Sequence, residues 1–423
     1  MTKLSASHMN PSALTEVSVA RPILDSINWN FSTPFSVGRS GMNLFDSRKH
    51  HWYPATFIAE IPYTLIEILS NPGAIVFDPF GGIGTTAFQA LLLARKPYIS
   101  ELGLVSTDFM FSMWELFKTE YDLSSILTDF EKLKSAFDQH KDYSKELVKT
   151  EIKVESLRPW YPKATFNQLM YLALSEHKRR NPAIKAAMRI AFSATLKAVC
   201  AQDRGWGCIA DNMLPTRVQL NKERNALDQF GRKLNSLIKD LTEVQKALTK
   251  ESKEFLSTTD VSLRIARVDA RKCEHVPDAS VDLIVTSPPY PNMTDYALSQ
   301  RLSYYWLGSD PSVDLVHEIG ARRKRNSSSS IQNYREDMKA VMKVLSKKLR
   351  NGGYACFVMP GFEGDKTNNT ERKKAVQECL AFLLTNDFIL EQEIHRILPN
   401  LRRHHNQKWT SLEREIIHIY RKV

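Results

Sequence analysis

The sequence of 423 residues predicts an α/β protein built on a doubly wound sheet, and three observations predict this class. The first is a short apolar run at residues 73–77, which leads into a glycine-rich turn and a helix-like stretch at 87–94. The second is an apolar run at 281–285, typical of a buried strand, which ends in Thr-Ser-Pro-Pro-Tyr. The third is a closing region, from residue 354 onward, in which strand-like and helix-like patterns alternate.

The expected elements follow each other in the order of these patterns. Strands are expected at residues 73–77, 96–100, 263–268, 281–285, 354–359, 388–394 and 413–420. Helices are expected between them at residues 87–94, 296–307 and 371–384. Sheets of this kind bind ligands outside the carboxyl ends of their strands, where the strand order reverses. The residues expected to converge there are Asp78, Glu101, Asp269 and Ser287.

The turn at residues 78–86 reads Asp-Pro-Phe-Gly-Gly-Ile-Gly-Thr-Thr. Glycines let a backbone approach a ligand closely, and the start of the following helix offers free N–H groups to an anionic group. The turn lacks the Gly-Lys-Ser/Thr ending of a phosphate-binding P-loop and the Gly-x-Gly-x-x-Gly spacing of dinucleotide sites. On its own, a glycine turn of this kind is a weak signal.

The sequence at residues 286–290 fits chemistry on a flat ring that carries an amino group. Two successive prolines stop a strand and leave carbonyl oxygens as free acceptors. Ser287 adds a hydroxyl beside these carbonyls, and Tyr290 adds an aromatic face. Acceptors that hold the two amino hydrogens favour a pyramidal, reactive nitrogen, while the aromatic ring can stack. The alternative is that the prolines simply end the strand and Tyr290 packs in a core.

Taken together, the two segments resemble the amino-methylating DNA methyltransferases. The turn resembles their S-adenosyl-L-methionine motif, and Thr-Ser-Pro-Pro-Tyr resembles their catalytic motif in the form of the N4-cytosine group. Adenine-directed relatives usually carry Asp or Asn where Ser287 stands, so an N6-adenine enzyme is the alternative that depends on this residue. The resemblance implies direct in-line methyl transfer to a flipped cytosine, in a prokaryotic restriction-modification or related defence system.

The resemblance also implies roles for single residues. Glu101 is similar to the acidic residue that binds the ribose hydroxyls, Asp269 to the acceptor for the adenine amino group, and Phe57 to a position beside the methionine moiety. The implied cofactor-binding set is Phe57, Asp78, Pro79, Phe80, Gly81, Gly82, Gly84, Thr85, Thr86, Glu101 and Asp269. The implied catalytic set is Ser287, Pro288, Pro289 and Tyr290. In this scheme Ser287 and the Pro288 carbonyl hold the amino hydrogens, and Tyr290 stacks on the base.

The domain organisation follows from the distance between Glu101 and the third expected strand, which is too long for a loop within a compact domain. We expect residues 107–260 to form an inserted, mainly helical domain, between a cofactor-binding half at 1–106 and a catalytic half at 261–423. Helical spacing of apolar residues recurs at 107–117, 123–140, 183–200 and 220–256. The inserted domain is expected to read the DNA target, and residues 308–334 are the alternative.

The formal net charge of +11 fits a polyanionic partner, which the resemblance identifies as double-stranded DNA. A basic stretch at 321–326, followed by four serines, is expected to be a mobile loop, and a second basic stretch lies at 401–405. The side chains expected to contact phosphates are Arg322, Arg323, Arg325, Arg402 and Arg403. A solvated surface without a partner is the alternative for these arginines.

Five cysteines are scattered without metal-ligand spacing, which favours a reducing cytoplasm and predicts no metal site. No Pro-Cys dipeptide occurs, so the covalent route to carbon-5 methylation has no evident nucleophile. The N-terminus lacks the apolar core of a signal peptide and the chain lacks an 18-residue apolar stretch, so we expect a soluble cytoplasmic protein with no membrane partner. A monomer is favoured, and the resemblance allows a cognate restriction endonuclease as a partner.

Two further alternatives stay open. An RNA guanosine amino-methyltransferase would share the turn and Pro-Pro-Tyr, but such enzymes usually carry a sizeable RNA-binding domain at the N-terminus, and only about 70 residues precede the first strand here. A catalytically silent DNA-binding protein with the same fold would be expected to have lost Asp78, Gly84 or Ser287, and all three are present.

Overall fold

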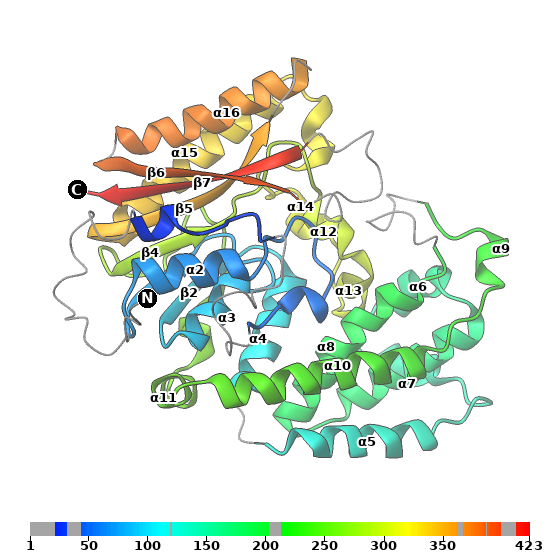
Figure 1. Cartoon of the computed structure of the whole chain (residues 1–423). Helices are drawn as coiled ribbons and strands as arrows, with labels where there is room; N and C mark the ends of the chain where they lie inside the picture. The colour runs from blue at the N-terminus through cyan, green and yellow to red at the C-terminus, as the bar shows by residue number, and fades with distance from the viewer. Residues whose placement is uncertain are drawn as a thin grey trace.

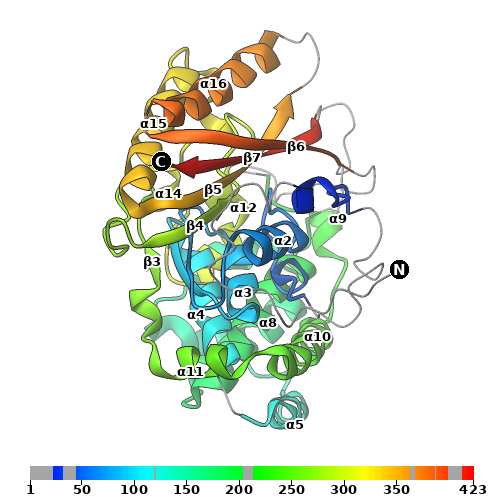
Figure 2. The ribbon, with the colours of Figure 1, turned by 60° about the vertical axis from the view of Figure 1, so that its left-hand side comes forward.

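The computed structural model describes residues 22–31, 44–118, 121–202, 213–362, 367–385, 387–398 and 412–423. Within this part of the chain, a seven-stranded sheet occupies the upper half of the molecule, and a group of helices lies below it (Figures 1 and 2). The sheet and the helices that cover it confirm the predicted α/β class.

The sheet has the strand order β3-β2-β1-β4-β5-β7-β6. Its strands are β1 (Ile75–Asp78), β2 (Lys96–Glu101), β3 (Ile265–Arg267), β4 (Val281–Thr286), β5 (Leu349–Phe362), β6 (Phe388–Ile397) and β7 (Leu412–Lys422). The strands from β3 to β5 are parallel, whereas β7 is antiparallel to both β5 and β6. The order reverses between β1 and β4, so the carboxyl ends of these two strands lie side by side, where such sheets bind ligands.

Helices cover both faces of the sheet because successive residues of a strand point to opposite sides. Phe77 and Ile284 pack into the core beneath α15 and α16, whereas Val76 and Leu283 pack into the core beneath α2. Figures 1 and 2 show α15 and α16 on one side of the strands and α2 on the other. The covering helices are α2 (Glu60–Leu69), α3 (Thr85–Leu92), α15 (Ser330–Lys348) and α16 (Thr367–Leu384).

A long helical region connects β2 to β3. Its longer helices are α4 (Leu104–Lys118), α5 (Leu123–Ser135), α7 (Lys163–His177), α8 (Pro182–Val199), α10 (Ala226–Ala247) and α11 (Lys250–Thr258). Its short ones are η3 (Tyr143–Lys149), α6 (Val154–Leu157), η4 (Arg158–Trp160), α9 (Arg217–Leu220) and η5 (Val261–Leu263). One continuous apolar core joins this region to the sheet, since Phe88 of α3 and Ile99 of β2 belong to the same cluster as Phe230 of α10. The proposed domain boundaries near residues 107 and 260 stay predictions.

Several expected elements have other bounds in the structure, since α5 ends at Ser135 rather than at residue 140, and β3 is shorter than the strand expected at 263–268. Three further elements differ in kind. The helical pattern at residues 220–256 is divided between α10 and α11, because the backbone is extended at Leu248 and at Thr249, whose side chain caps α11. The helix expected at 296–307 is divided at Gln300 into α12 (Tyr296–Ser299) and α13 (Arg301–Trp306). The basic stretch expected to be a mobile loop forms the 3-10 helix η6 (Arg322–Asn326), which follows α14 (Ser312–Leu315).

Two absences hold for the residues that the structure describes. None of their helices is long and apolar enough to cross a membrane. No group of three or more His, Cys, Asp or Glu side chains among them has the arrangement of a metal site.

Candidate active site

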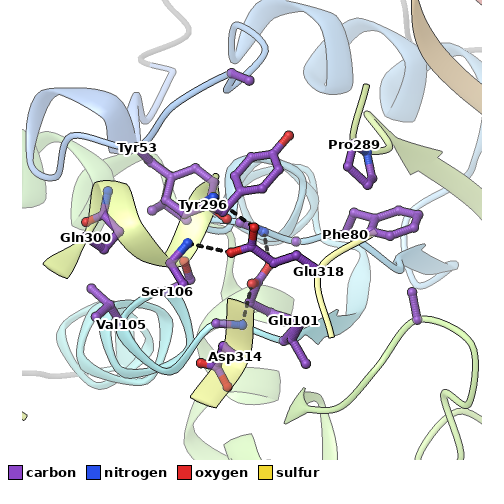
Figure 3. A pocket seen from close by; sticks show the side chains of 18 of the residues that line it. Tyr53, Phe80, Glu101, Val105, Ser106, Pro289, Tyr296, Gln300, Asp314 and Glu318 are labelled. Atoms are coloured by element: carbon purple, nitrogen blue, oxygen red, sulfur yellow. Dashed lines mark hydrogen bonds between the residues drawn. The ribbon is translucent and has the colours of Figure 1, made fainter. Parts of the chain in front are cut away.

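A cleft opens at the carboxyl ends of β1, β2 and β4 (Figure 3). Its empty volume is about 950 Å³, including the part open to solvent. The cleft brings together residues that lie far apart in the sequence. The predicted site residues that line it are Phe57, Pro79, Phe80, Gly81, Gly82, Thr85, Glu101, Asp269, Ser287 and Pro289.

Asp78 lies beneath the cleft and is fully buried. Its carboxylate accepts hydrogen bonds from the Thr86 hydroxyl at 2.8 Å, the Thr286 hydroxyl at 2.6 Å and the Phe80 backbone N–H at 3.0 Å. Burial raises the pKa of Asp78 to about 6, although these hydrogen bonds act in the opposite direction. Asp78 therefore ties the turn after β1 to the end of β4, and Thr86 supports the turn from below without lining the cleft.

The glycines of the turn meet different steric needs. A Cβ atom at Gly81 would lie 2.2 Å from Cγ2 of Ile99 in β2, so the turn packs directly against the neighbouring strand. Gly84 has a φ of +77°, and a Cβ atom there would lie 2.7 Å from the Phe88 ring. Gly84 caps the start of α3 behind the cleft rather than lining it. These contacts explain why the turn needs glycine before any ligand is considered.

Glu101 closes the cleft at the end of β2. Its Oε2 accepts the Gly82 backbone N–H and its Oε1 accepts the Gly103 backbone N–H, both at 2.7 Å (Figure 3). Burial raises the pKa of Glu101 to about 7, and the nearby charges of Asp78 and Asp314 add to this effect. Each carboxylate oxygen still has a second lone pair, so Glu101 can accept two further hydrogen bonds from a diol.

Asp269 lies two residues after β3 and lines the cleft. Its Oδ1 accepts both the backbone N–H and the Nε–H of Arg271 at 2.9 Å. Burial opposes ionisation of Asp269 more than any other single effect, but the hydrogen bonds and charge of Arg271 together hold its pKa below the ordinary value. Asp269 is therefore a fixed, ionised acceptor at the cleft wall.

The Ser-Pro-Pro-Tyr segment faces two ways. Ser287 and Pro289 line the cleft, whereas Pro288 and Tyr290 do not. The Tyr290 hydroxyl donates instead to Oε1 of Glu415 in β7, at 3.3 Å. The segment thus forms the border between the cleft and the region above β5 and β7.

Phe57 enters the cleft on the stretch at residues 51–57, which is fixed by Gln300 between α12 and α13. Oε1 of Gln300 lies 2.7 Å from Nε2 of His51, and its Nε2 donates to the Trp52 carbonyl at 2.9 Å. Burial lowers the pKa of His51 to about 4, so its ring is neutral near pH 7. The neighbouring Tyr53 also lines the cleft.

Sequence reasoning missed an aromatic and acidic wall opposite the turn. The rings of Tyr53 and Tyr296 stack with centroids 5.6 Å apart. Oε1 of Glu318 accepts the Ala297 backbone N–H at 2.6 Å, and burial raises the pKa of Glu318 to about 7. Asp314 accepts the Tyr304 hydroxyl at 2.6 Å. The segment carrying the two carboxylates has no motif, so only its tertiary contacts reveal it.

The predicted phosphate contacts lie beyond this wall, on η6. The Arg323 backbone N–H donates to Oδ1 of Asp295 at 2.9 Å, and the Lys324 ammonium donates to the Glu318 carbonyl at 2.9 Å. These contacts hold the segment against the cleft wall, which is why it is not the mobile loop expected from its composition. The side chains of Arg322, Arg323 and Arg325 are exposed. Arg402 and Arg403 lie outside the described residues.

Comparison with known proteins finds matches to DNA and type II methyltransferases. Residues 28–145, which include the glycine turn and Glu101, match the N6/N4 methyltransferase family model, described as DNA methylase. The chain is also 22% identical over 307 residues to the type II methyltransferase M.BsoBI of Geobacillus stearothermophilus. This match covers 67% of the chain and 56% of that protein. The sequence is therefore similar to those of DNA methyltransferases, and the seven-stranded α/β sheet is consistent with a methyltransferase fold.

Proposed function

We propose that the protein is a site-specific DNA methyltransferase that transfers a methyl group from S-adenosyl-L-methionine to the exocyclic N4 of a flipped cytosine. One observation carries this proposal: Ser287 and Pro289 line the same cleft as Glu101, Asp269 and the glycine turn. The Ser-Pro-Pro-Tyr segment, whose oxygens can accept the hydrogens of an amino group, thus lies beside the carboxylates of Glu101 and Asp269 at one edge of the sheet. By its likeness to a type II methyltransferase, the chain is assigned to a restriction-modification or related defence system, with a cognate endonuclease as partner.

The residues of the cleft fit the proposed cofactor. Glu101, with a free lone pair on each carboxylate oxygen, suits a ribose diol, and the ionised Asp269, although Arg271 already donates to both of its oxygens, is assigned to an amino group. The apolar faces of Phe57 and Phe80 suit flat or aliphatic groups. When bound, the cofactor would supply an electrophilic methyl group. A Cβ atom at Gly82 would lie 3.3 Å from the Tyr53 ring. Because glycine has no Cβ, the backbone at this position stays open to the cleft.

The contribution of the protein is mainly orientation. The Ser287 hydroxyl and the Pro288 carbonyl are assigned to the two hydrogens of the target amino group, and the ring of Tyr290 is assigned to the face of the base. Such placement accelerates a direct transfer without a strong base. A base inside a duplex must leave the stack to reach this segment, so base flipping is part of the proposal. The exposed arginines of η6 are assigned to phosphates, and the helical region 107–260 to target reading.

Mass analysis of digested DNA tests the reaction. Unmethylated phage DNA treated with the protein and S-adenosyl-L-methionine should contain N4-methylcytosine, because Ser287 stands where adenine-directed relatives carry Asp or Asn. It should contain no 5-methylcytosine, because the sequence has no Pro-Cys nucleophile. A Ser287→Ala control should form much less product. N6-methyladenine as the only product would overturn the base assignment, and the absence of any methylated base would overturn the proposed activity.

A further inference from the structure

The Tyr290 hydroxyl is held by a polar group that the proposed reaction does not use. It donates to Oε1 of Glu415 at 3.3 Å. Burial and the negative charge of Glu415 raise the pKa of Tyr290 well above its ordinary value, so the hydroxyl keeps its proton and remains a donor. A partner on another element, β7, therefore fixes where the end of this ring lies.

Glu415 is itself held by a buried cation. Arg396 of β6 stands directly opposite Glu415 in the antiparallel pairing of β6 with β7. Its Nη1 forms an ion pair and hydrogen bond with Oε2 of Glu415, and its Nε donates to the Trp29 carbonyl at 3.2 Å. The two carboxylate oxygens of Glu415 thus have different tasks, since Oε2 binds Arg396 and Oε1 receives the Tyr290 hydroxyl.

The burial of this ion pair argues against a purely stabilising role. The Arg396 side chain is only 1% exposed, and its Nη2 has no hydrogen-bond partner among the described residues. A buried ion pair recovers little more than its desolvation cost, and apolar side chains of similar size often stabilise a fold as well. A second pair on the same two strands, between Arg421 and Glu391, has a more exposed arginine, at 28%, and lies level with Tyr354 of β5, six residues before the Pro360 that pairs with Glu415.

We propose that Glu415 is a positioning residue for Tyr290: held by Arg396, it fixes the ring in one orientation beside Ser287. An aromatic ring can rotate about its side-chain bonds, and stacking on a base requires one plane. The strand register places Glu415 near the Ser-Pro-Pro-Tyr segment. Glu415 pairs with Pro360 of β5, and the backbone carbonyl of Val358 in the same strand accepts the Ser287 hydroxyl at 3.4 Å. The functional consequence rests on the proposed methyl transfer, whereas the positioning itself does not.

Fluorine NMR of protein labelled with 3-fluorotyrosine tests the positioning without DNA or cofactor. The resonance of Tyr290 is identified by its loss in Tyr290→Phe. Glu415→Ala should shift and broaden this resonance, because the ring would exchange between orientations, and the isosteric Glu415→Gln should have a smaller effect because its amide oxygen can still accept. The matched control Glu391→Ala should leave the resonance unchanged. A Tyr290 resonance in Glu415→Ala identical to that of the wild type would overturn the proposal.

Kinetics on unmethylated phage DNA test the consequence for catalysis. Glu415→Ala should lower kcat by roughly ten- to hundredfold, the scale expected when a group near the reacting atoms is misplaced, with little change in KM for DNA. Glu415→Gln should recover part of kcat, and Glu391→Ala should match the wild type. Equal losses in Glu415→Ala and Glu391→Ala would contradict the proposal. A wild-type protein that transfers no methyl group would overturn the proposed function, and the fluorine spectra would still decide the role of Glu415.

Discussion

At the scale of single residues, the Glu101 side chain combines burial with unused acceptor capacity. Glu101 has a pKa near 7 because burial disfavours its charged form, yet its ionised form is the one that would accept hydrogen bonds from a diol. Binding of such a ligand should therefore require loss of a proton below pH 7. This property distinguishes Glu101 from Asp269, which Arg271 keeps ionised.

The affinity for S-adenosyl-L-methionine should consequently depend on pH. We expect the association constant to rise between about pH 5.5 and pH 7, by at most about tenfold per unit, and to level off above the pKa of Glu101. Titration calorimetry at several pH values would measure it. Glu101→Gln should bind more weakly at pH 8 and lose the part of the dependence due to this carboxyl. Glu318→Gln is the matched control, because Glu318 has a similar pKa, and it should retain the contribution of Glu101. A flat wild-type profile would contradict the role given to Glu101.

Individual site residues were predictable from the sequence where they stand in a motif or follow an expected strand, as Glu101 and Asp269 do. Residues 78–86 and 286–290 carry their own local signals, because glycine, proline and the strand ends restrict the backbone. Glu318 and Tyr296 carry no such signal. They reach the cleft because the Glu318 carboxylate accepts backbone N–H groups at the start of α12, which is a tertiary contact.

At the scale of elements, the strands were predictable and the helix ends were less so. The central strands β1 and β4 are short, mainly apolar runs, and burial on both faces leaves little freedom in where they lie. The division of residues 220–256 into α10 and α11 depends on the Thr249 cap, which a periodic apolar pattern does not reveal. The order of η6 likewise depends on Asp295 and on the carbonyls that bind Lys324, not on its own composition.

The fixed position of η6 sharpens the prediction for DNA binding. Replacement of Arg322, Arg323 and Arg325 by Ala should weaken binding at every sequence and reduce the slope of log affinity against log salt by up to about 2.7, because each phosphate contact contributes about 0.9. Lys324 is kept, since it anchors the segment. Binding isotherms at several salt concentrations would provide the slope.

The control for this experiment removes the same charge elsewhere. Lys343, Lys347 and Arg350 are exposed at the end of α15 and the start of β5, at the amino ends of the strands and away from the cleft. Their replacement by Ala should leave the slope close to that of the wild type. An equal reduction in both triple variants would indicate a general effect of net charge, and an unchanged slope in the η6 variant would assign these arginines to solvent.

At the scale of the whole molecule, the helical region and the sheet share one core. Phe230 of α10 packs against Phe130 of α5 with ring centroids 5.1 Å apart, and both belong to the cluster that includes Ile99 of β2. The inner faces of these helices therefore serve the stability of the cofactor-binding half. Only their outer faces, such as Arg232, Asn235 and Lys239 on α10, are free to vary with a DNA target.

This division predicts how target specificity can be transferred. We expect that replacing the exposed residues of the region 107–260 by those of a relative with another target, while every buried residue is kept, would transfer the methylated sequence. Direct readout requires polar side chains on an element that fits a groove, and the outer helical faces supply them. Affinity for S-adenosyl-L-methionine should stay near its original value, because Glu101, Asp269 and the turn are unchanged. Sequencing of modified bases would identify the target. A folded, active chimera that still methylates the original sequence would place target reading elsewhere, and residues 308–334 beside the cleft would be the next segment to exchange.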